Sequence, residues 1–357
     1  MWLVLFSSLY RLCRFLLSRL VFFYQLAFKK SPDFEPVITI GHLGLRAINR
    51  LIPSVFTYPI PQGIATTLYD LTFPSPLILA AFEGDQRIVS IWSQFGLGGT
   101  TFKTVLPHPH LGNARPRIQS IVYQGSPCLI NAMGLPSKGL AAFLQSLHCY
   151  TPHPEKPIGL SIGGHCVEEY LHVFSSIYEF VSHHPVWKNQ PVFFEYNISC
   201  PNTPHHESIG KNPALITDLL TKTRSLTSNA IISVKLSPDH SDDTLLELAD
   251  RIGQHPLTAL TLGNTHYHTC SSVGLPDHTL SIGGGGLSGP PLLSRTLDMI
   301  DLLAPFGLPI IATGGIHTGP QALLARQKGA TLIGLATAVV QDPYVIVRIN
   351  RYLASIK

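Results

Sequence analysis

The alternation of short apolar runs with helix-like stretches predicts an α/β protein, a (β/α)8 TIM barrel preceded by an N-terminal apolar helical extension. Eight such units follow one another from residue 77 over about 280 residues, and a barrel of this kind needs roughly 250. Hydrophobic residues make up 45% of the chain and charged residues 13%, which suits a large core. A doubly wound open sheet is the alternative, but no GxGxxG follows the first strand.

The first segment, residues 2–28, is strongly apolar but contains three arginines, whose presence inside a spanning helix would cost roughly 7–10 kcal/mol. On a helical wheel the polar side chains fall within about 140° of arc: Ser7, Ser8, Arg11, Arg14, Ser18, Arg19 and Gln25. The opposite side carries Trp2, Leu5, Phe6, Leu9, Leu12, Leu16, Leu20 and Phe23. This pattern predicts a helix lying in the membrane interface, its apolar face down and its arginines toward the lipid phosphates.

Other interpretations of the first segment stay open. Arginine side chains that snorkel would allow a true membrane span, and the helix could instead dock on its own domain. A signal peptide is disfavoured, because no basic region precedes the apolar run and no small-residue cleavage site follows it.

A second apolar helix is expected over residues 35–51. Ser31-Pro32-Asp33 is a helix-start signal, and Pro53 follows the end of the helix. The two helices could form a hairpin with an apolar channel between them. We therefore expect a membrane-associating helical extension over 1–52, a proline-rich linker with short strands over 53–76, and the barrel over 77–357.

The barrel units begin with apolar runs that end in Gly, Asn, Lys or Ser. The expected strands are 77–81, 100–103, 158–162, 192–197, 231–236, 257–262, 309–313 and 331–336. Helices are expected at 85–96, 166–183, 213–226, 241–254, 319–328 and 343–355. Two connections, 104–157 and 263–308, are long, and long loops in compact domains tend to be functional.

Residues with chemical capacity gather where these strands end, which is where TIM barrels carry their active sites. They are Ala80, Ala81, Lys103, Asn197, Cys200, Lys235, Asn264, Thr265, Gly314, Gly315 and Thr337. Two lysines directed into one barrel mouth are costly unless an anion or an electron-rich ring is present. The sequence therefore predicts a charged cofactor or substrate.

Glycines near the last two strands predict phosphate binding. Thr313-Gly314-Gly315-Ile316 ends the seventh strand, and Gly334-Leu335-Ala336-Thr337 ends the eighth. The loops after these strands commonly hold a phosphate on backbone N–H groups. The glycine run over 283–289 is expected to form a further anion-binding nest.

Charge and cysteine usage disfavour other partners. The net charge of +4 comes without a long basic run, so no nucleic acid is predicted. Six cysteines without a CxxC pair indicate neither a disulfide framework nor a zinc site, and fit a reducing cytosolic compartment. Among seventeen histidines, His266 and His268 lie two apart, but this spacing promises no tetrahedral site, so no metal is expected.

Several motifs together resemble the dihydroorotate dehydrogenase family, in order over most of residues 70–345. They are Asn197-Ile198-Ser199-Cys200-Pro201-Asn202-Thr203-Pro204, Val234-Lys235-Leu236, Gly285-Gly286-Leu287-Ser288-Gly289, Ala312-Thr313-Gly314-Gly315-Ile316 and Ile130-Asn131-Ala132-Met133-Gly134-Leu135. The resemblance implies an FMN-binding barrel that oxidises dihydroorotate to orotate in pyrimidine synthesis.

The chain mixes features of the two classes of this family. Its apolar N-terminal helices resemble the membrane-bound, quinone-reducing class 2, whereas Cys200 and Lys103 match class 1. The class 2 lysine expected after Ala80-Ala81 is missing, because Phe82-Glu83-Gly84-Asp85-Gln86 stands there. Ser137 replaces an asparagine seen in the family. Quinone is the expected electron acceptor, with fumarate, another soluble acceptor or NAD through a partner subunit left open.

The resemblance also implies the roles of individual residues. Substrate would contact Lys103, Asn131, Met133, Gly134, Leu135, Asn197, Asn202, Asn264 and Thr265. FMN would contact Ala80, Ala81, Lys103, Thr104, Asn197, Lys235, Gly285, Gly286, Gly289, Gly314, Gly315, Ala336 and Thr337.

The expected reaction removes a proton from C5 of dihydroorotate, taken by Cys200 as catalytic base, and a hydride from C6, taken by FMN. The expected location is the membrane, with the barrel on the cytoplasmic side. Two other functions remain: an FMN barrel oxidoreductase acting on another pyrimidine, and a membrane-tethered binder of FMN or a pyrimidine without turnover.

Overall fold

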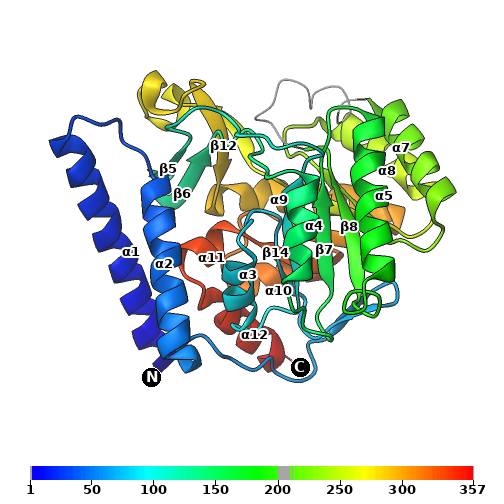
Figure 1. The fold of residues 1–357 in the computed structure, drawn as a ribbon, viewed down its shortest axis with the longest axis horizontal. Helices are drawn as coiled ribbons and strands as arrows, with labels where there is room; N and C mark the ends of the chain where they lie inside the picture. The colour runs from blue at the N-terminus through cyan, green and yellow to red at the C-terminus, as the bar shows by residue number, and fades with distance from the viewer. Residues whose placement is uncertain (1, 200–209, 211, 357) are drawn as a thin grey trace.

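The computed structural model describes residues 2–199, 210 and 212–356, and confirms the predicted barrel (Figure 1). Eight parallel strands close on themselves in chain order, and each overlaps one of the eight predicted strands. They are β3 (Leu77–Leu79), β4 (Gly99–Val105), β7 (Ile158–Ile162), β8 (Val192–Asn197), β9 (Ile232–Leu236), β10 (Thr258–Leu262), β13 (Ile310–Thr313) and β14 (Ala330–Leu335). Every residue of β7, β9 and β10 is buried, as expected of parallel strands covered on both faces.

A short hairpin closes one end of the barrel. Its strands are β1 (Thr66–Leu68) and β2 (Leu71–Phe73), which pair antiparallel. Leu68 and Phe73 are fully buried in a cluster with residues near the beginnings of the barrel strands, among them Phe193 and Ile311. The N-terminal ends of the strands are therefore filled, and the C-terminal ends remain for a site.

Helices surround the barrel, and several begin at side-chain caps. Ser241 accepts the N–H of Thr244, and Thr318 forms a capping box with Gln321. The surrounding helices are α3 (Gln86–Ser93), α4 (Leu140–His148), α5 (Val167–His183), α7 (Pro213–Leu226), α8 (Asp242–Gly253), α9 (Leu293–Leu303), α10 (Gly319–Gln327), α11 (Thr337–Gln341) and α12 (Val345–Ser355). Short 3-10 turns lie at Pro53–Val55, Ser271–Val273, Asp277–Thr279, Pro290–Leu292 and Ala304–Phe306.

The predicted helix over 343–355 is confirmed as α12, which begins at Val345. A short helix that was not predicted, α11, precedes it, and the extended residue Asp342 lies between the two. Pro343 explains the break, because a residue that precedes proline is disfavoured in the helical conformation.

The two long connections are not simple loops, as we had expected, but build a second sheet. It is antiparallel, in the order β11 (His266–Thr269), β12 (Gly284–Ser288), β6 (Ser126–Asn131) and β5 (Ile118–Tyr123). The predicted glycine nest is therefore wrong for residues 284–288, which form β12. A β-carbon at Gly285 would lie 2.4 Å from the carbonyl oxygen of Asn131, so glycine here permits close strand packing.

The N-terminal helices α1 (Trp2–Ala27) and α2 (Glu35–Leu51) lie side by side along one flank of the barrel (Figure 1). One side of α1 packs on the protein and combines polar and apolar side chains: Ser7, Tyr10, Arg14 and Gln25 with Leu3, Phe6, Leu17 and Val21. Ser7 donates a hydrogen bond to Asp342 (2.6 Å), and the Gln25 amide exchanges two hydrogen bonds with the Asp33 backbone. Most of the predicted apolar arc is exposed, except Phe6, which packs against the core. No helix among residues 2–199, 210 and 212–356 is long and apolar enough to cross a membrane.

The arginines of α1 do not all point toward lipid, contrary to expectation. The guanidinium of Arg14 lies over the Phe34 ring, 5.6 Å from its centroid, and Arg11 approaches Asp342. The docked side of α1 therefore cuts across the two predicted arcs, because Ser8, Arg11 and Arg19 of the polar arc are exposed while Phe6 of the apolar arc packs against the core.

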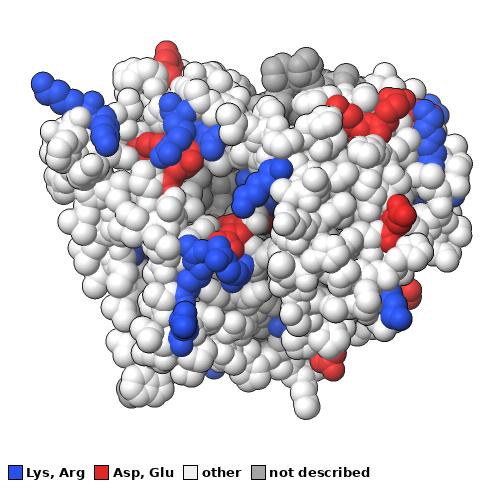
Figure 2. Space-filling model, in the orientation of Figure 1, with Lys and Arg blue, Asp and Glu red and all other residues white. Residues whose placement is uncertain are grey.

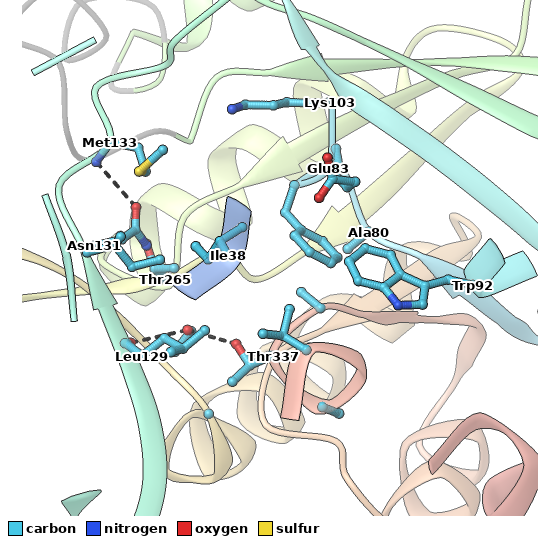
Figure 3. Close-up of a pocket in the computed structure, with 18 of the residues that line it drawn as sticks. Ile38, Ala80, Glu83, Trp92, Lys103, Leu129, Asn131, Met133, Thr265 and Thr337 are labelled. Atoms are coloured by element: carbon cyan, nitrogen blue, oxygen red, sulfur yellow. Dashed lines mark hydrogen bonds between the residues drawn. The ribbon is translucent and has the colours of Figure 1, made fainter. Parts of the chain in front are cut away.

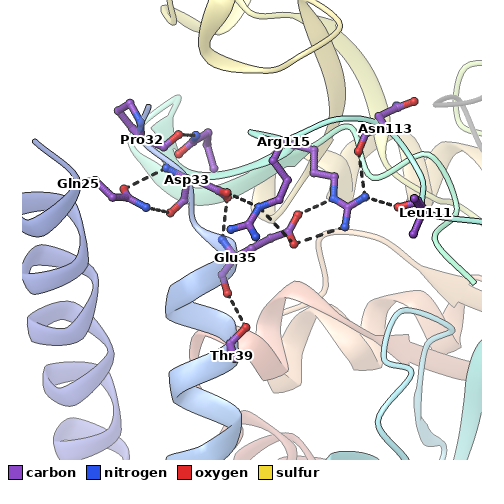
Figure 4. A network of polar contacts seen from close by, with 10 residues as sticks. Gln25, Pro32, Asp33, Glu35, Thr39, Leu111, Asn113 and Arg115 are labelled. Atoms are coloured by element: carbon purple, nitrogen blue, oxygen red, sulfur yellow. Dashed lines mark hydrogen bonds and ion pairs between the residues drawn. The ribbon is translucent and has the colours of Figure 1, made fainter. Parts of the chain in front are cut away.

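Ion pairs fasten the turn between α1 and α2 to the second sheet (Figure 4). Arg115 contacts Asp33, and Arg117 contacts Glu35 with its Nε and Nη2 atoms. Gln119 on β5 donates to the carbonyl of Pro32. These contacts place the helix pair beside the open end of the barrel.

Candidate active site

A cavity of about 680 Å³ joins the helix pair to the C-terminal ends of the barrel strands (Figure 3). Residues of α1 and α2 form one end of its lining, including Leu17, Ile38 and Leu45. The other end reaches residues at the ends of β3, β4, β8, β9, β13 and β14. This volume is within the usual range of ligand sites.

A chain of buried hydrogen bonds orients Asn197 at the end of β8. Its Nδ2 donates to Thr104 Oγ1 (2.7 Å), and the Thr104 hydroxyl lies 3.0 Å from Ser161, which donates to Glu195. The Asn197 Oδ1 accepts the hydroxyl of Ser199 (3.1 Å). Because these partners are buried, the amide is held in one orientation on the cavity wall.

Ser199 extends this network to the next strand. Asn264, after β10, donates from Nδ2 to both the carbonyl and the hydroxyl oxygen of Ser199, each at 3.0 Å. The Asn264 Oδ1 accepts the backbone N–H of Thr265 (2.8 Å). Asn197, Asn264 and Thr265 all line the cavity. Ser199 lies within the predicted motif but was not itself predicted as a site residue.

Asn131 also lines the cavity, at the end of β6 (Figure 3). Its Nδ2 donates to the Gly286 carbonyl (3.3 Å), and its Oδ1 accepts the Met133 N–H (3.4 Å). Gly134 and Leu135 follow with positive φ values of 67° and 49°. This tight backbone places residues 133–135 on the cavity wall.

Ser137 stabilises the loop that follows. Its hydroxyl accepts the N–H groups of Leu106 and Gly139, each at 3.2 Å. The serine at this position therefore ties the loop after β6 to the end of β4.

Two lysines line the cavity, as predicted. Lys103 is on β4, and Lys235 on β9 is buried. Within the described residues the Lys235 ammonium makes no hydrogen bond or ion pair. Burying an unpaired charge is costly, so the site suits an anion or an electron-rich ring beside Lys235.

The glycines after β13 line the cavity. Gly314 and Gly315 have φ values of 141° and 71°, which glycine adopts without strain. Beside them, the Thr313 hydroxyl and the His317 Nε2 are buried without a hydrogen-bond partner among the described residues. Burial lowers the pKa of His317. Thr337 donates to Ser288 (2.8 Å) at the beginning of α11. Such a set fits a phosphate-bearing cofactor.

The structure brings most of the predicted residues together. Those that line the cavity are Ala80, Ala81, Lys103, Thr104, Asn131, Met133, Gly134, Leu135, Asn197, Lys235, Asn264, Thr265, Gly289, Gly314, Gly315, Ala336 and Thr337. Gly285 and Gly286 lie instead against Asn131 and Thr265. Cys200 and Asn202 fall outside the described residues.

Sequence reasoning missed one ionisable pair on the cavity wall. His42 of α2 and Glu83, in the loop after β3, approach to 3.3 Å. Burial raises the pKa of Glu83, while His42, the Asp85 N–H and Lys103 oppose the shift. Glu83 was noticed only as a departure from a family lysine, and its partner lies 41 residues earlier (83 − 42).

The fold and the position of the cavity define a barrel enzyme with its site at the strand ends. A family model described as dihydroorotate dehydrogenase matches residues 63–356. Relatives called dihydroorotate dehydrogenase (quinone) include one from Chloroflexus aurantiacus, 31% identical over 88% of this chain and 89% of its own. Another, from Christiangramia forsetii, is 29% identical over 80% of this chain and 82% of its own.

Solved structures agree on the fold. The DHODH from Eimeria tenella in complex with ferulenol has a TM-score of 0.72 and 22% identity, covering 88% of this chain and 91% of that one. The chain belongs to the dihydroorotate dehydrogenase family.

Proposed function

We propose that this protein oxidises dihydroorotate to orotate in pyrimidine biosynthesis, with FMN as cofactor and a membrane quinone as electron acceptor. The observation that carries this proposal is the continuous cavity, which reaches from the apolar helix pair to the polar strand ends. A hydrophobic electron acceptor can enter at the first end while a carboxylated pyrimidine binds at the second. Relatives over most of the chain bear the name dihydroorotate dehydrogenase (quinone).

The amides around the strand ends are suited to a flat pyrimidine. Asn131, Asn197 and Asn264 offer donors and acceptors that their own hydrogen bonds already orient. Asn202 would add a fourth amide. The backbone of residues 133–135, with the N–H groups of Gly134 and Leu135, would line the carboxylate end, and Lys103 would add a positive charge.

FMN would lie between this pocket and the barrel, and when bound it supplies hydride acceptance and onward electron transfer. Gly289, Gly314, Gly315 and Thr337 would hold its phosphate and ribityl chain, and Lys235 its ring. Ala80, Ala81 and Ala336 are small enough to admit the ring. The Cys200 thiol would take the proton from C5, with its thiolate favoured locally.

Residues 1–52 would attach the protein to the membrane surface. The support is the orientation of α1, which docks partly through Ser7 and Gln25 and leaves most of its apolar arc exposed. Quinone dissolved in the bilayer would then reach the cavity between α1 and α2. The barrel, residues 77–357, would lie on the cytoplasmic side, where pyrimidine precursors are soluble.

The direct test is turnover by the purified, FMN-loaded protein. Dihydroorotate with decylubiquinone should give orotate, read by its ultraviolet absorbance, and fumarate or NAD should serve poorly. A chain lacking residues 1–52 should keep reduction of its flavin by dihydroorotate but lose quinone reduction. No flavin uptake, or no bleaching with dihydroorotate, would refute the proposal. Rapid turnover with fumarate alone would replace quinone as the acceptor.

A further inference from the structure

His42 and Glu83 form a partly buried acid–base pair on the cavity wall. The His42 Nε2 and the Glu83 Oε2 are 3.3 Å apart, and their side chains are only 19% and 12% exposed. His42 comes from α2, whereas Glu83 belongs to the barrel mouth, so the pair bridges the two ends of the cavity. Figure 3 shows Glu83 directed toward the cavity between Lys103 and Trp92.

The surroundings hold Glu83 in this position. Its Oε1 accepts the N–H of Asp85 (2.6 Å), and its backbone carbonyl accepts the N–H of Lys103 (3.3 Å). The Trp92 ring lies edge-on to His42, with 6.3 Å between centroids. One carboxylate oxygen is therefore fixed by the loop, and the other faces the imidazole.

Charged groups from each neighbouring element act on the pair. Lys103 on β4 and His42 on α2 favour the Glu83 carboxylate, and Asp85 in the same loop opposes it. Asp85 is itself paired with Arg46 of α2 and Arg87 of α3. Burial is the largest influence on Glu83, and it favours the protonated carboxyl.

We propose that the His42–Glu83 pair gives a proton to the quinone as it is reduced to quinol, an inference that rests on the proposed function. Quinol formation consumes two electrons and two protons. The hydride leaving C6 of dihydroorotate carries both electrons and one proton, while the other proton leaves C5 on a different side chain. The quinone must therefore collect one proton at its own site. One quinol O–H bond forms as the pair releases its proton.

The pair also has a route for reprotonation. Charged side chains of both signs gather around a hollow between the N-terminal helices and the barrel (Figure 2). Both members of the pair keep some exposure to solvent. Water can therefore replace the proton after each turnover, although most of the cavity near α1 and α2 is apolar.

A purely structural role is the competing explanation, because the pair ties α2 to the barrel. The chain offers a matched control, since Arg46 joins α2 to the same loop through Asp85 at 3.4 Å. Arg46→Gln removes this tie without removing a group able to exchange a proton near neutral pH.

The experiment follows the two half-reactions by stopped flow in wild type, Glu83→Gln, His42→Gln and Arg46→Gln. We expect flavin reduction by dihydroorotate to be unchanged in all four. Reoxidation by decylubiquinone should slow by about 100-fold in Glu83→Gln and His42→Gln and lose its pH dependence, since general acids contribute on this scale. Reoxidation by ferricyanide, which takes no proton, should stay at the wild-type rate.

Infrared spectroscopy gives a readout that needs no turnover. FMN-free wild-type protein should show a protonated-carboxyl band that persists above the usual titration range of glutamate, and Glu83→Gln should lack it. Wild-type quinone kinetics and pH profile in Glu83→Gln, or equal slowing in Arg46→Gln, would overturn the inference. Slowing with ferricyanide as well would also overturn it. Failure of wild type to reduce quinone would refute the proposed function instead.

Discussion

Replacing three exposed leucines of α1 by glutamine should weaken binding to lipid vesicles about a hundredfold. Leu5, Leu9 and Leu16 lie on the apolar arc and are 52%, 51% and 50% exposed. Fully burying a leucine side chain contributes about 2 kcal/mol, so burying the exposed half of each contributes about 1 kcal/mol. The triple variant should lose about 3 kcal/mol, or roughly a hundredfold in Kd.

The assay is cosedimentation of the full FMN-loaded protein with vesicles of phosphatidylcholine and phosphatidylglycerol. Glutamine preserves helix propensity, so α1 should remain folded and docked through Ser7 and Gln25. The matched control replaces three exposed apolar residues elsewhere, Val186, Leu226 and Leu324, by glutamine. Equal losses in both triple variants, or unchanged binding of the α1 variant, would refute the assignment of this arc to the membrane.

Three further predictions concern the barrel. Lys235→Met should weaken FMN binding by about 1.5–3 kcal/mol, the usual contribution of a hydrogen bond to a charged group, in a fluorescence titration. Burial raises the pKa of Glu83 above its ordinary value of 4.5, so between that value and the raised pKa the folded state holds a proton that the unfolded state has lost. Stability to urea should therefore fall as pH rises from 4.5 through the raised pKa. Glu83→Gln should flatten that slope, and an unchanged slope would contradict the assignment. Gly286→Ala would place a β-carbon 1.9 Å from the Thr265 hydroxyl and should destabilise the fold by about 1–3 kcal/mol, whereas Gly44→Ala, with nothing within 4 Å, should not.

The barrel strands were predictable because each is an apolar run of a length that fits a strand buried on both faces. The second sheet was not. Beyond Ile118, the residues of β5 alternate only between half-buried and exposed positions inside a long connection, and β12 consists largely of glycine, which is depleted in strands. Strand pairing across 155 residues, as between Asn131 and Gly286, leaves no local signal.

Some residues of the site were likewise predictable from the sequence, and others were not. Asn197, Lys235 and Gly314 stand at strand ends, so the barrel rule alone brings them together. His42 and Glu83 meet only because α2 packs beside the barrel mouth, and a helical wheel cannot give that geometry. The wheel likewise could not show that the docked side of α1 would combine Ser7 with Leu17 and Val21.

The hairpin of β1 and β2 decides where this polypeptide can be shortened. Leu68 and Phe73 fill the N-terminal end of the barrel, and neither belongs to the helix pair. A chain that starts just before Pro53 keeps these two side chains and should keep the N-terminal end of the barrel closed to water. A chain that starts at residue 77 would expose that end to water. The folded barrel therefore begins with this hairpin, which precedes the first barrel strand.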